Sequence, residues 1–199
     1  MSKALEIARE LVKQLEEAEK NNKIQLSELK PGEIFKIGDH DFIVLEQEEL
    51  QTKVISKAFM DKNIVFDNNT RDYNKSNLKK IIETDIQPVI EDAVGTDNLV
   101  EHEVDLTSVD MQNEFGSCIC KVRPITFDEA RKYNDVLVNN DLGDLWWTCT
   151  PWSTEERGWE YSIAVVSSSG YVYYDFCRNR RGVRPFCILK SNIFVSKGE

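Results

Sequence analysis

The first pattern along the chain is helical. Apolar residues recur at spacings of three and four across residues 2–21, which is the period of one face of an α-helix. The apolar positions are Ala4, Ala8, Leu11, Leu15 and Ala18, with Leu5 and Val12 beside them. The stripe spans too few heptads to indicate a coiled coil. Two interpretations stay open: the helix packs on its own domain, or it mediates self-association.

The next segment has the pattern of β-strands. Lys30-Pro31-Gly32 predicts a turn, and apolar runs at 34–37 and 42–45 then flank the polar residues 38–41. This arrangement predicts a β-hairpin. A third strand is expected over 52–59, followed by a polar surface loop over 67–73.

Helical signals return in the middle of the chain. Ser76 can cap a short helix, and a second helix is expected from about Asp85 to Gly95, with Pro88 tolerated in its first turn. Residues 104–109 alternate loosely and suggest a strand. Thr126 and Glu129 have the spacing of a capping box, which predicts a further helix.

From Leu145 onward the pattern is again that of strands. They are predicted over 161–166, 171–176, 183–189 and 193–195, with a turn at 167–170 and a loop over 148–158. An order of helix, strands, helices and strands predicts an α+β fold. We therefore assign residues 1–22 to an N-terminal helix and residues 26–199 to one domain.

Charge is distributed unevenly along the 199 residues. No Lys or Arg occurs from Ile81 to Cys120, a stretch that we call the acidic segment, and its ten carboxylates equal the net charge of −10. Direct nucleic-acid binding is disfavoured, because phosphate contacts need basic side chains. No apolar run approaches the roughly 20 residues of a membrane helix. The N-terminal stretch also lacks the apolar core of a signal peptide, so we expect a cytoplasmic or virion-associated protein.

The sequence offers little for catalysis. Five cysteines are an odd number and favour reduced, buried thiols over a disulfide framework. His40 and His102 are the only histidines, so we expect no metal site and no cofactor. No nucleophilic triad, glycine-rich phosphate loop or zinc-protease motif occurs. These features indicate that the protein is not an enzyme.

The C-terminal third resembles a known family. Asp144 to Trp152 contains a tryptophan pair followed by a Pro step, a strand–Gly170–strand hairpin comes next, and Gly182-Val183-Arg184-Pro185 precedes an apolar strand. This order is similar to that of an uncharacterised bacterial and phage domain family with the formylglycine-generating-enzyme type of C-type-lectin fold. Weaker matches at Pro31-Gly32, at 76–78 and at 122–126 extend the resemblance over about 26–195.

The resemblance implies a fold more than an activity. It implies a twisted antiparallel sheet that supports irregular C-terminal loops, and these loops present the ligand contacts. Relatives of this fold include retroelement-diversified binding proteins and the formylglycine-generating oxidases, which use paired cysteines with copper. Cys177 and Cys187 would be the corresponding pair here, but their apolar flanks indicate core thiols.

Aromatic and arginine side chains near the C-terminus form the candidate ligand face, because these residue types are enriched at binding hot spots. The candidates are Trp152, Trp159, Tyr171, Tyr173, Asp175, Arg178 and Arg180. We expect them on one side of the molecule, with Val172, Tyr174 and Phe176 turned toward the core. The alternative for the two tryptophans is that they fasten their loop to the sheet. Arg184 is expected to be structural, bound to a carboxylate or to backbone carbonyls.

Three functions follow from these observations. The leading hypothesis is a non-catalytic module that binds a protein or glycan ligand, with a phage or prophage as one expected source. The second is an inhibitor or regulator whose acidic segment occupies a basic nucleic-acid channel of a partner protein. The third and weakest is an oxidase of the formylglycine-generating type. The first two differ in the surface that binds, and an acidic inhibitor should lose affinity steeply as salt is added.

Overall fold

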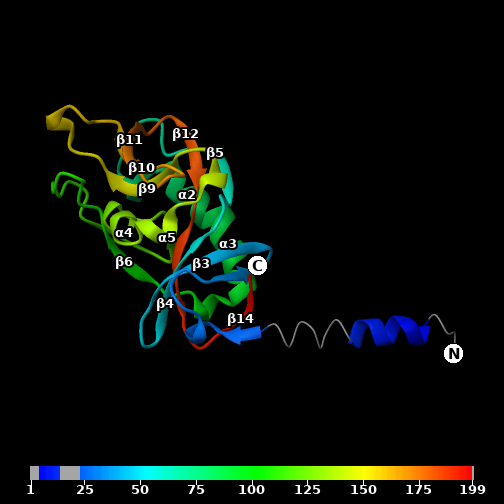
Figure 1. Ribbon diagram of the computed structural model, residues 1–199. Helices are drawn as coiled ribbons and strands as arrows, with labels where there is room; N and C mark the ends of the chain where they lie inside the picture. The colour runs from blue at the N-terminus through cyan, green and yellow to red at the C-terminus, as the bar shows by residue number, and fades with distance from the viewer. Residues whose placement is uncertain (1–4, 14–22, 199) are drawn as a thin grey trace.

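The computed structural model describes residues 5–13 and 23–198 and has a mixed α+β architecture with mostly antiparallel sheets (Figure 1). Residues 5–13 are helical, which confirms that part of the predicted N-terminal helix. The remainder of the range 2–21 lies outside the described residues. Leu5, Ile7, Leu11 and Val12 are exposed on this helix. None of the helices that the structure describes is long and apolar enough to cross a membrane.

The larger sheet has seven strands. In spatial order they are β1 (Lys23–Gln25), β14 (Phe194–Lys197), β2 (Ile34–Ile37), β3 (His40–Gln47), β4 (Gln51–Ser56), β13 (Phe186–Lys190) and β8 (Val122–Arg123). Each neighbouring pair is antiparallel, and β2 and β3 form the predicted hairpin. Strand β1 pairs with β14, so the sheet includes residues just before the expected start at residue 26.

A second sheet has five strands. Their order is β11 (Val172–Phe176), β10 (Ser162–Val166), β9 (Trp146–Pro151), β12 (Arg180–Val183) and β5 (Asp61–Val65). Strands β9 and β12 are parallel, and the other pairs are antiparallel. Strand β11 is an edge strand, at the opposite end of the molecule from β14 (Figure 1). Strands β6 (His102–Asp105) and β7 (Ser117–Cys120) form a separate antiparallel pair.

Short helices connect the sheets, and their first residues follow the sequence signals. Helix α2 (Asn77–Ile81) begins after Ser76, whose hydroxyl accepts a hydrogen bond from the Lys79 amide. A π-type turn (Ile82–Ile86) leads into α3 (Gln87–Val94). Helix α4 (Phe127–Lys132) begins with the complete capping box that the sequence predicted, and α5 (Asn134–Leu137) follows it.

The motif Gly182-Val183-Arg184-Pro185 carries the chain from one sheet to the other. Gly182 and Val183 end β12 of the five-stranded sheet, and Arg184 and Pro185 lead into β13 of the seven-stranded sheet. A Cβ atom at Gly182 would lie 2.5 Å from the Phe59 ring, so a larger residue would collide with it. The Pro185 carbonyl accepts a hydrogen bond from the Ser56 amide at 3.0 Å. The predicted single strand over 183–189 is therefore two strands in different sheets.

Arg184 is fully buried, as a structural role requires. Its Nε donates to the Ser56 carbonyl at 2.9 Å and its Nη1 to the Leu137 carbonyl at 3.0 Å. The guanidinium carbon lies 4.9 Å from the centre of the Trp146 ring. Burial lowers the pKa of Arg184 to about 10, so the side chain is still a cation at neutral pH. Of the two kinds of acceptor expected for Arg184, the structure shows backbone carbonyls rather than a carboxylate.

Both tryptophans of the pair are buried. Trp146 and Trp147 point to opposite faces of β9, and each face is covered by its own apolar cluster. The Trp147 indole also donates to the Ile64 carbonyl at 2.8 Å. Two further expectations were wrong. Residues 148–151 belong to β9 rather than to a loop. The expected surface loop over 67–73 contains three buried residues, Arg71, Asp72 and Tyr73.

The burial of Trp147 leads to a stability prediction. Trp147→Ala should lower the free energy of unfolding by about 3–5 kcal/mol, because it leaves a cavity and removes the hydrogen bond to Ile64. Arg178→Ala, at an exposed position, should change it by no more than about 0.5 kcal/mol. Urea unfolding of both variants measures the difference. Similar losses for the two would contradict the burial described here.

A second prediction concerns the N-terminal helix. Deleting residues 1–22 should leave the two sheets folded, because the helical residues 5–13 are exposed and the first described strand begins at Lys23. Circular dichroism and a cooperative thermal transition at the temperature of the full chain would agree with this. Loss of the transition would place the helix in the folding unit.

Candidate functional site

Three aromatic side chains meet above the edge of the five-stranded sheet. The ring centres of Trp152 and Trp159 are 6.2 Å apart, and the Tyr174 ring lies 5.3 Å from Trp152 and 4.7 Å from Trp159. We call these three residues the aromatic cluster. Tyr174 is 47% exposed, and both tryptophans are partly exposed. The cluster therefore fastens the loop to β11 and also presents aromatic surface to solvent.

Strand β11 divides the predicted ligand face in two. Tyr173 and Tyr174 are neighbours on a strand, so they point to opposite faces. Tyr171 and Tyr173 pack against each other with ring centres 6.3 Å apart, on the face opposite the aromatic cluster. Trp159, Tyr173 and Arg178 are each at least partly exposed, as expected, but they do not share one face.

Tyr174 and Phe176 were wrongly assigned to the core. Each is 47% exposed, because β11 is an edge strand and neither of its faces is fully covered at that end of the sheet. Apolar alternation marks a buried face only where another layer packs on it. The sequence signal that could have revealed the exposure is four aromatic residues among the six at 171–176, which leaves no polar face for solvent.

The remaining predicted residues have partners within the chain. Asp175 accepts hydrogen bonds from Arg181 Nε and from Asn179 Nδ2, both at 2.6 Å. Arg180 Nη1 donates to the Asn63 carbonyl at 2.8 Å. The Arg178 guanidinium lies 5.6 Å from the centre of the Phe176 ring, on which it can make a cation–π contact. Asp175 therefore supports the turn after β11 and Arg180 binds the neighbouring strand β5, whereas Arg178 and Phe176 extend the exposed surface.

Asp110, which the sequence analysis did not single out, fixes the loop that carries the tryptophans. Its carboxylate accepts hydrogen bonds from Ser153 Oγ and Arg157 Nη1, both at 2.5 Å, and from Ser108 Oγ at 2.6 Å. Burial alone would raise the pKa of Asp110, but these three donors lower it to about 2. The loop that bears Trp152 and Trp159 is thus tied to the loop before β7.

A second link between the same two loops comes from Arg71, which is almost fully buried. Its Nη2 donates to both carboxylate oxygens of Glu114, at 2.9 and 2.7 Å, and its Nε donates to the Glu160 carbonyl at 3.1 Å. The guanidinium also lies 4.9 Å from the centre of the Phe115 ring. Two carboxylates of the acidic segment, Asp110 and Glu114, therefore hold the candidate ligand loop in place.

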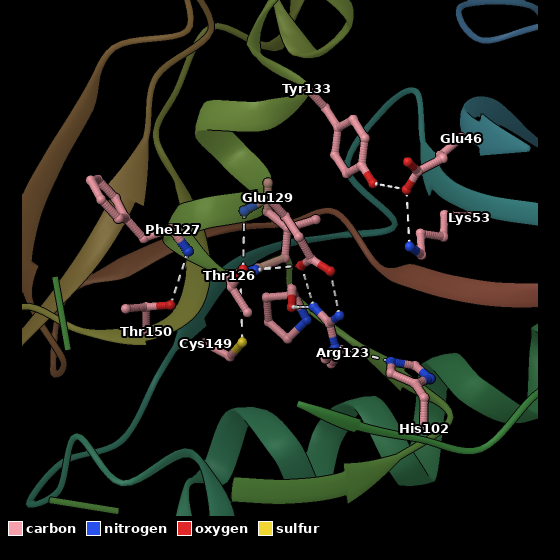
Figure 2. Close-up of polar contacts among 12 residues, drawn as sticks. Glu46, Lys53, His102, Arg123, Thr126, Phe127, Glu129, Tyr133, Cys149 and Thr150 are labelled. Atoms are coloured by element: carbon pink, nitrogen blue, oxygen red, sulfur yellow. Dashed lines mark hydrogen bonds and ion pairs between the residues drawn. The ribbon is translucent and has the colours of Figure 1, made fainter. Parts of the chain in front are cut away.

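A polar pocket of about 290 Å³ lies beside helix α4, and Arg123 and Glu129 are among its lining residues. Figure 2 shows Arg123 between Glu129 and His102. Two guanidinium nitrogens donate to the two Glu129 oxygens at 2.6 Å each, and Nε donates to His102 Nε2 at 3.0 Å. Glu129 also accepts the Thr126 amide of the capping box at 2.8 Å. This network joins β8 to the start of α4.

The charges of this network are those of a structural ion pair. Burial alone would lower the pKa of Arg123 and raise that of Glu129, but their mutual hydrogen bonds reverse both shifts. Burial and the nearby Arg123 charge lower the pKa of His102 to about 4. The imidazole is therefore neutral, and its free lone pair is occupied by Arg123. In this arrangement the acceptor nitrogen of His102 is occupied by Arg123, and both carboxylate oxygens of Glu129 accept hydrogen bonds from the guanidinium.

The cysteines are buried free thiols. Burial raises the pKa of Cys177 and of Cys187, the pair that the resemblance would assign to copper chemistry. Burial also raises the pKa of Cys149 to about 12. Thiolates are the reactive and metal-binding form, and these sulfurs stay protonated at neutral pH. Within residues 5–13 and 23–198, no three His, Cys, Asp or Glu residues are grouped as a metal site would need.

Comparisons with known proteins add no relative. No protein-family model matches the chain, and neither a curated protein nor a solved structure matches it.

His102 provides a test of the buried network. Its pKa is lower in the folded chain than the usual 6.5, so the unfolded chain binds the proton more readily and stability should fall as the pH drops from about 6.5 toward 4. The loss should reach at most about 3 kcal/mol. His102→Gln should flatten this part of the curve. Urea unfolding between pH 7 and 5 measures it, above the usual pKa values of 4.5 and 3.8 at which Glu46 and Asp110 take up protons in the unfolded chain.

If wild type and His102→Gln lose stability in parallel over this range, the proton is taken up elsewhere and the neutral His102 described here is wrong.

Proposed function

We propose that this chain is a non-catalytic binding module whose ligand face is centred on the aromatic cluster. The observation that carries the proposal is the exposed surface of Trp152, Trp159 and Tyr174 on a loop and an edge strand. Aromatic side chains bring large contact areas with few rotatable bonds, and they dominate binding hot spots. Phe176 and Arg178 extend the face at one side.

The loop that bears the tryptophans is held before any ligand arrives. Asp110 binds Ser153 and Arg157 at one part of the loop, and Arg71 binds the Glu160 carbonyl at its end. A surface that is ordered in advance loses less conformational entropy on binding, which favours affinity. The ion pairs behind the loop therefore support a binding role.

A protein ligand is favoured over a glycan. The three rings meet at interplanar angles of 61°, 43° and 77°, so they form a ridged surface rather than one flat platform. Ridged aromatic surface beside an arginine suits the pockets of a protein partner. A glycan remains the alternative ligand within the same proposal, and the experiment below includes it.

We also propose that the fold is C-type-lectin-like. The resemblance of the tryptophan pair and of Gly182-Val183-Arg184-Pro185 to the family described above supports this. So does the pairing of β1 with β14, which brings distant parts of the chain together in one sheet, with the candidate ligand loop on a second sheet. The binding proposal rests on the aromatic cluster and does not need this fold assignment.

The acidic inhibitor is the second candidate, and the structure supports it less. Four of the ten carboxylates in the acidic segment form ion pairs with basic residues outside it: Glu83 with Lys79, Glu91 with Lys121, Asp110 with Arg157 and Glu114 with Arg71. These contacts neutralise part of the charge that a basic channel would meet. An oxidase is supported least, because the cysteines it would need are buried and protonated.

The binding proposal is tested with a displayed peptide and protein library, screened in parallel with a glycan array. For any ligand selected by the wild type, Trp159→Ala should weaken binding at least tenfold, since hot-spot residues contribute more than about 1.4 kcal/mol. Its melting temperature should stay close to that of the wild type. Phe194→Ala is the matched control, because Phe194 is an exposed aromatic residue on the other sheet.

The acidic-inhibitor hypothesis predicts a different set of effects. If ligands survive Trp159→Ala but are lost when the exposed acids Asp92 and Asp97 are replaced by Lys, the acidic segment is the binding surface and the present proposal fails.

A further inference from the structure

Strand β11 has an open hydrogen-bonding edge. Its partner β10 lies on one side only, with Val165 opposite Tyr173 and Ile163 opposite Asp175. The Ser167 amide donates to the Tyr171 carbonyl at 2.8 Å, and the Cys177 amide donates to the Tyr161 carbonyl at 2.7 Å. In an antiparallel pair these bonds recur at every second residue. Odd-numbered residues of β11 therefore bind β10, and the amides and carbonyls of even-numbered residues point away from it.

Only the centre of this edge is free. The Phe176 amide donates to the Asp175 carboxylate at 2.8 Å, and its carbonyl accepts the Asn179 amide at 2.8 Å. At the other end, the Gly170 amide and carbonyl are bonded to Ser167 and Asn134. Between these ends, the amides and carbonyls of Val172 and Tyr174 have no hydrogen-bond partner among the described residues. Four backbone groups on two residues are thus left open.

The side chains around these groups are uncharged and exposed. Tyr171 is 66% exposed and Tyr173 50%, on the face away from the aromatic cluster. The chain as a whole is 30% charged, yet residues 171–174 contain no charge. The nearest carboxylate, Asp175, is bound to Arg181 at 2.6 Å. An uncharged aromatic edge strand with unpaired backbone groups is a template for pairing with another strand.

We propose that β11 pairs with β11 of a second copy of this chain across a two-fold axis. Placing Tyr173 on the axis puts Val172 of each copy opposite Tyr174 of the other. Both residues direct their amide and carbonyl outward, so the two pairs form four hydrogen bonds and satisfy every open group. The two Tyr173 side chains then face each other, each flanked by Tyr171. The pairing joins the two five-stranded sheets into one.

Other registers and other strands fit less well. An antiparallel shift in either direction would bring Val172 opposite Phe176 or Tyr174 opposite Gly170, whose backbone groups are already bonded. A strand of another protein could also bond to Val172 and Tyr174. A second copy, however, supplies a strand whose backbone groups are unpaired over the same two residues and already bonded on either side of them. Self-complementarity of this kind is the property of an interface with two-fold symmetry.

The inference does not rest on the proposed ligand face. Tyr173 lies on the opposite face of β11 from Trp159, so Trp159→Ala should weaken ligand binding without changing the mass of the particle. Conversely, a loss of self-association should leave the aromatic cluster of each chain intact. The two proposals can therefore fail separately.

Light scattering across a dilution series and cysteine cross-linking test the pairing on the full chain. The wild type should approach twice the mass of one chain as its concentration rises. Tyr173→Lys should stay monomeric and melt at the temperature of the dilute, monomeric wild type, because two like charges would face each other across the axis. Tyr173→Cys should form a reducible dimer under mild oxidation, since the native cysteines are buried. Tyr171→Cys is the matched control, because residue 171 would face Asp175 rather than itself.

Three results would overturn the proposal. The first is a wild type that stays monomeric at every concentration. The second is a dimer that survives Tyr173→Lys, which would move the interface elsewhere, for example to the N-terminal helix. The third is equal cross-linking of Tyr173→Cys and Tyr171→Cys, which would show that collisions rather than a fixed register form the disulfide.

Discussion

The fold depends on a single passage of the chain between its two sheets. After β12 the backbone leaves the five-stranded sheet, and after two more residues it enters the seven-stranded sheet as β13, between β4 and the edge strand β8. Arg184 lies at this passage and donates to the carbonyls of the last residues of β4 and α5, Ser56 and Leu137. A buried cation without a carboxylate is costly unless several dipoles solvate it. Two carbonyls and the Trp146 ring contact the guanidinium, whose Nη2 has no hydrogen-bond partner among the described residues, and these contacts link the passage to β4, α5 and β9.

The relative position of the two sheets determines which side chains of β11 are exposed. The five-stranded sheet is covered near β9, where both tryptophans are buried, and uncovered at its edge, where four aromatic residues remain accessible. Gly170 fixes the position of that edge. Its φ is +82°, and a Cβ atom there would lie within 3.0 Å of Asn134 and Val138, so the hairpin turn packs directly on α5. The exposed aromatic residues are consequently held on a rigid frame.

Local signals in the sequence predicted local structure well. Four features were predicted from local sequence: the capping box at Thr126, the cap at Ser76, the first hairpin and the end of a helix at Gly95. They were predictable because short-range backbone hydrogen bonds determine them. The features that failed depend on distant partners. Whether Tyr174 is buried is decided by its place at a sheet edge, and the break after Val183 is decided by which sheet each half joins. The change of sheet after Val183 leaves no local pattern, and the exposure of Tyr174 leaves only the aromatic composition of residues 171–176.

The same distinction explains the candidate site. Aromatic and arginine residues identified the right region, and Trp152 and Trp159 do come together. The role of Asp110 could not be predicted, because its partners Ser153 and Arg157 are more than forty residues away. As a member of the acidic segment it seemed to be one of many surface charges. Only the folded chain shows that this carboxylate orders the loop between β9 and β10.

The Asp110–Arg157 contact has a consequence for how binding data on this protein would be interpreted. Both side chains are partly exposed, so added salt screens the attraction between them and loosens the loop that presents Trp152 and Trp159. Affinity for a wholly uncharged ligand would then decrease with ionic strength, although no charge lies at the contact itself. A salt-dependent affinity therefore does not by itself show that the ligand is charged. In this protein it can instead reflect how well the loop that bears Trp152 and Trp159 is ordered.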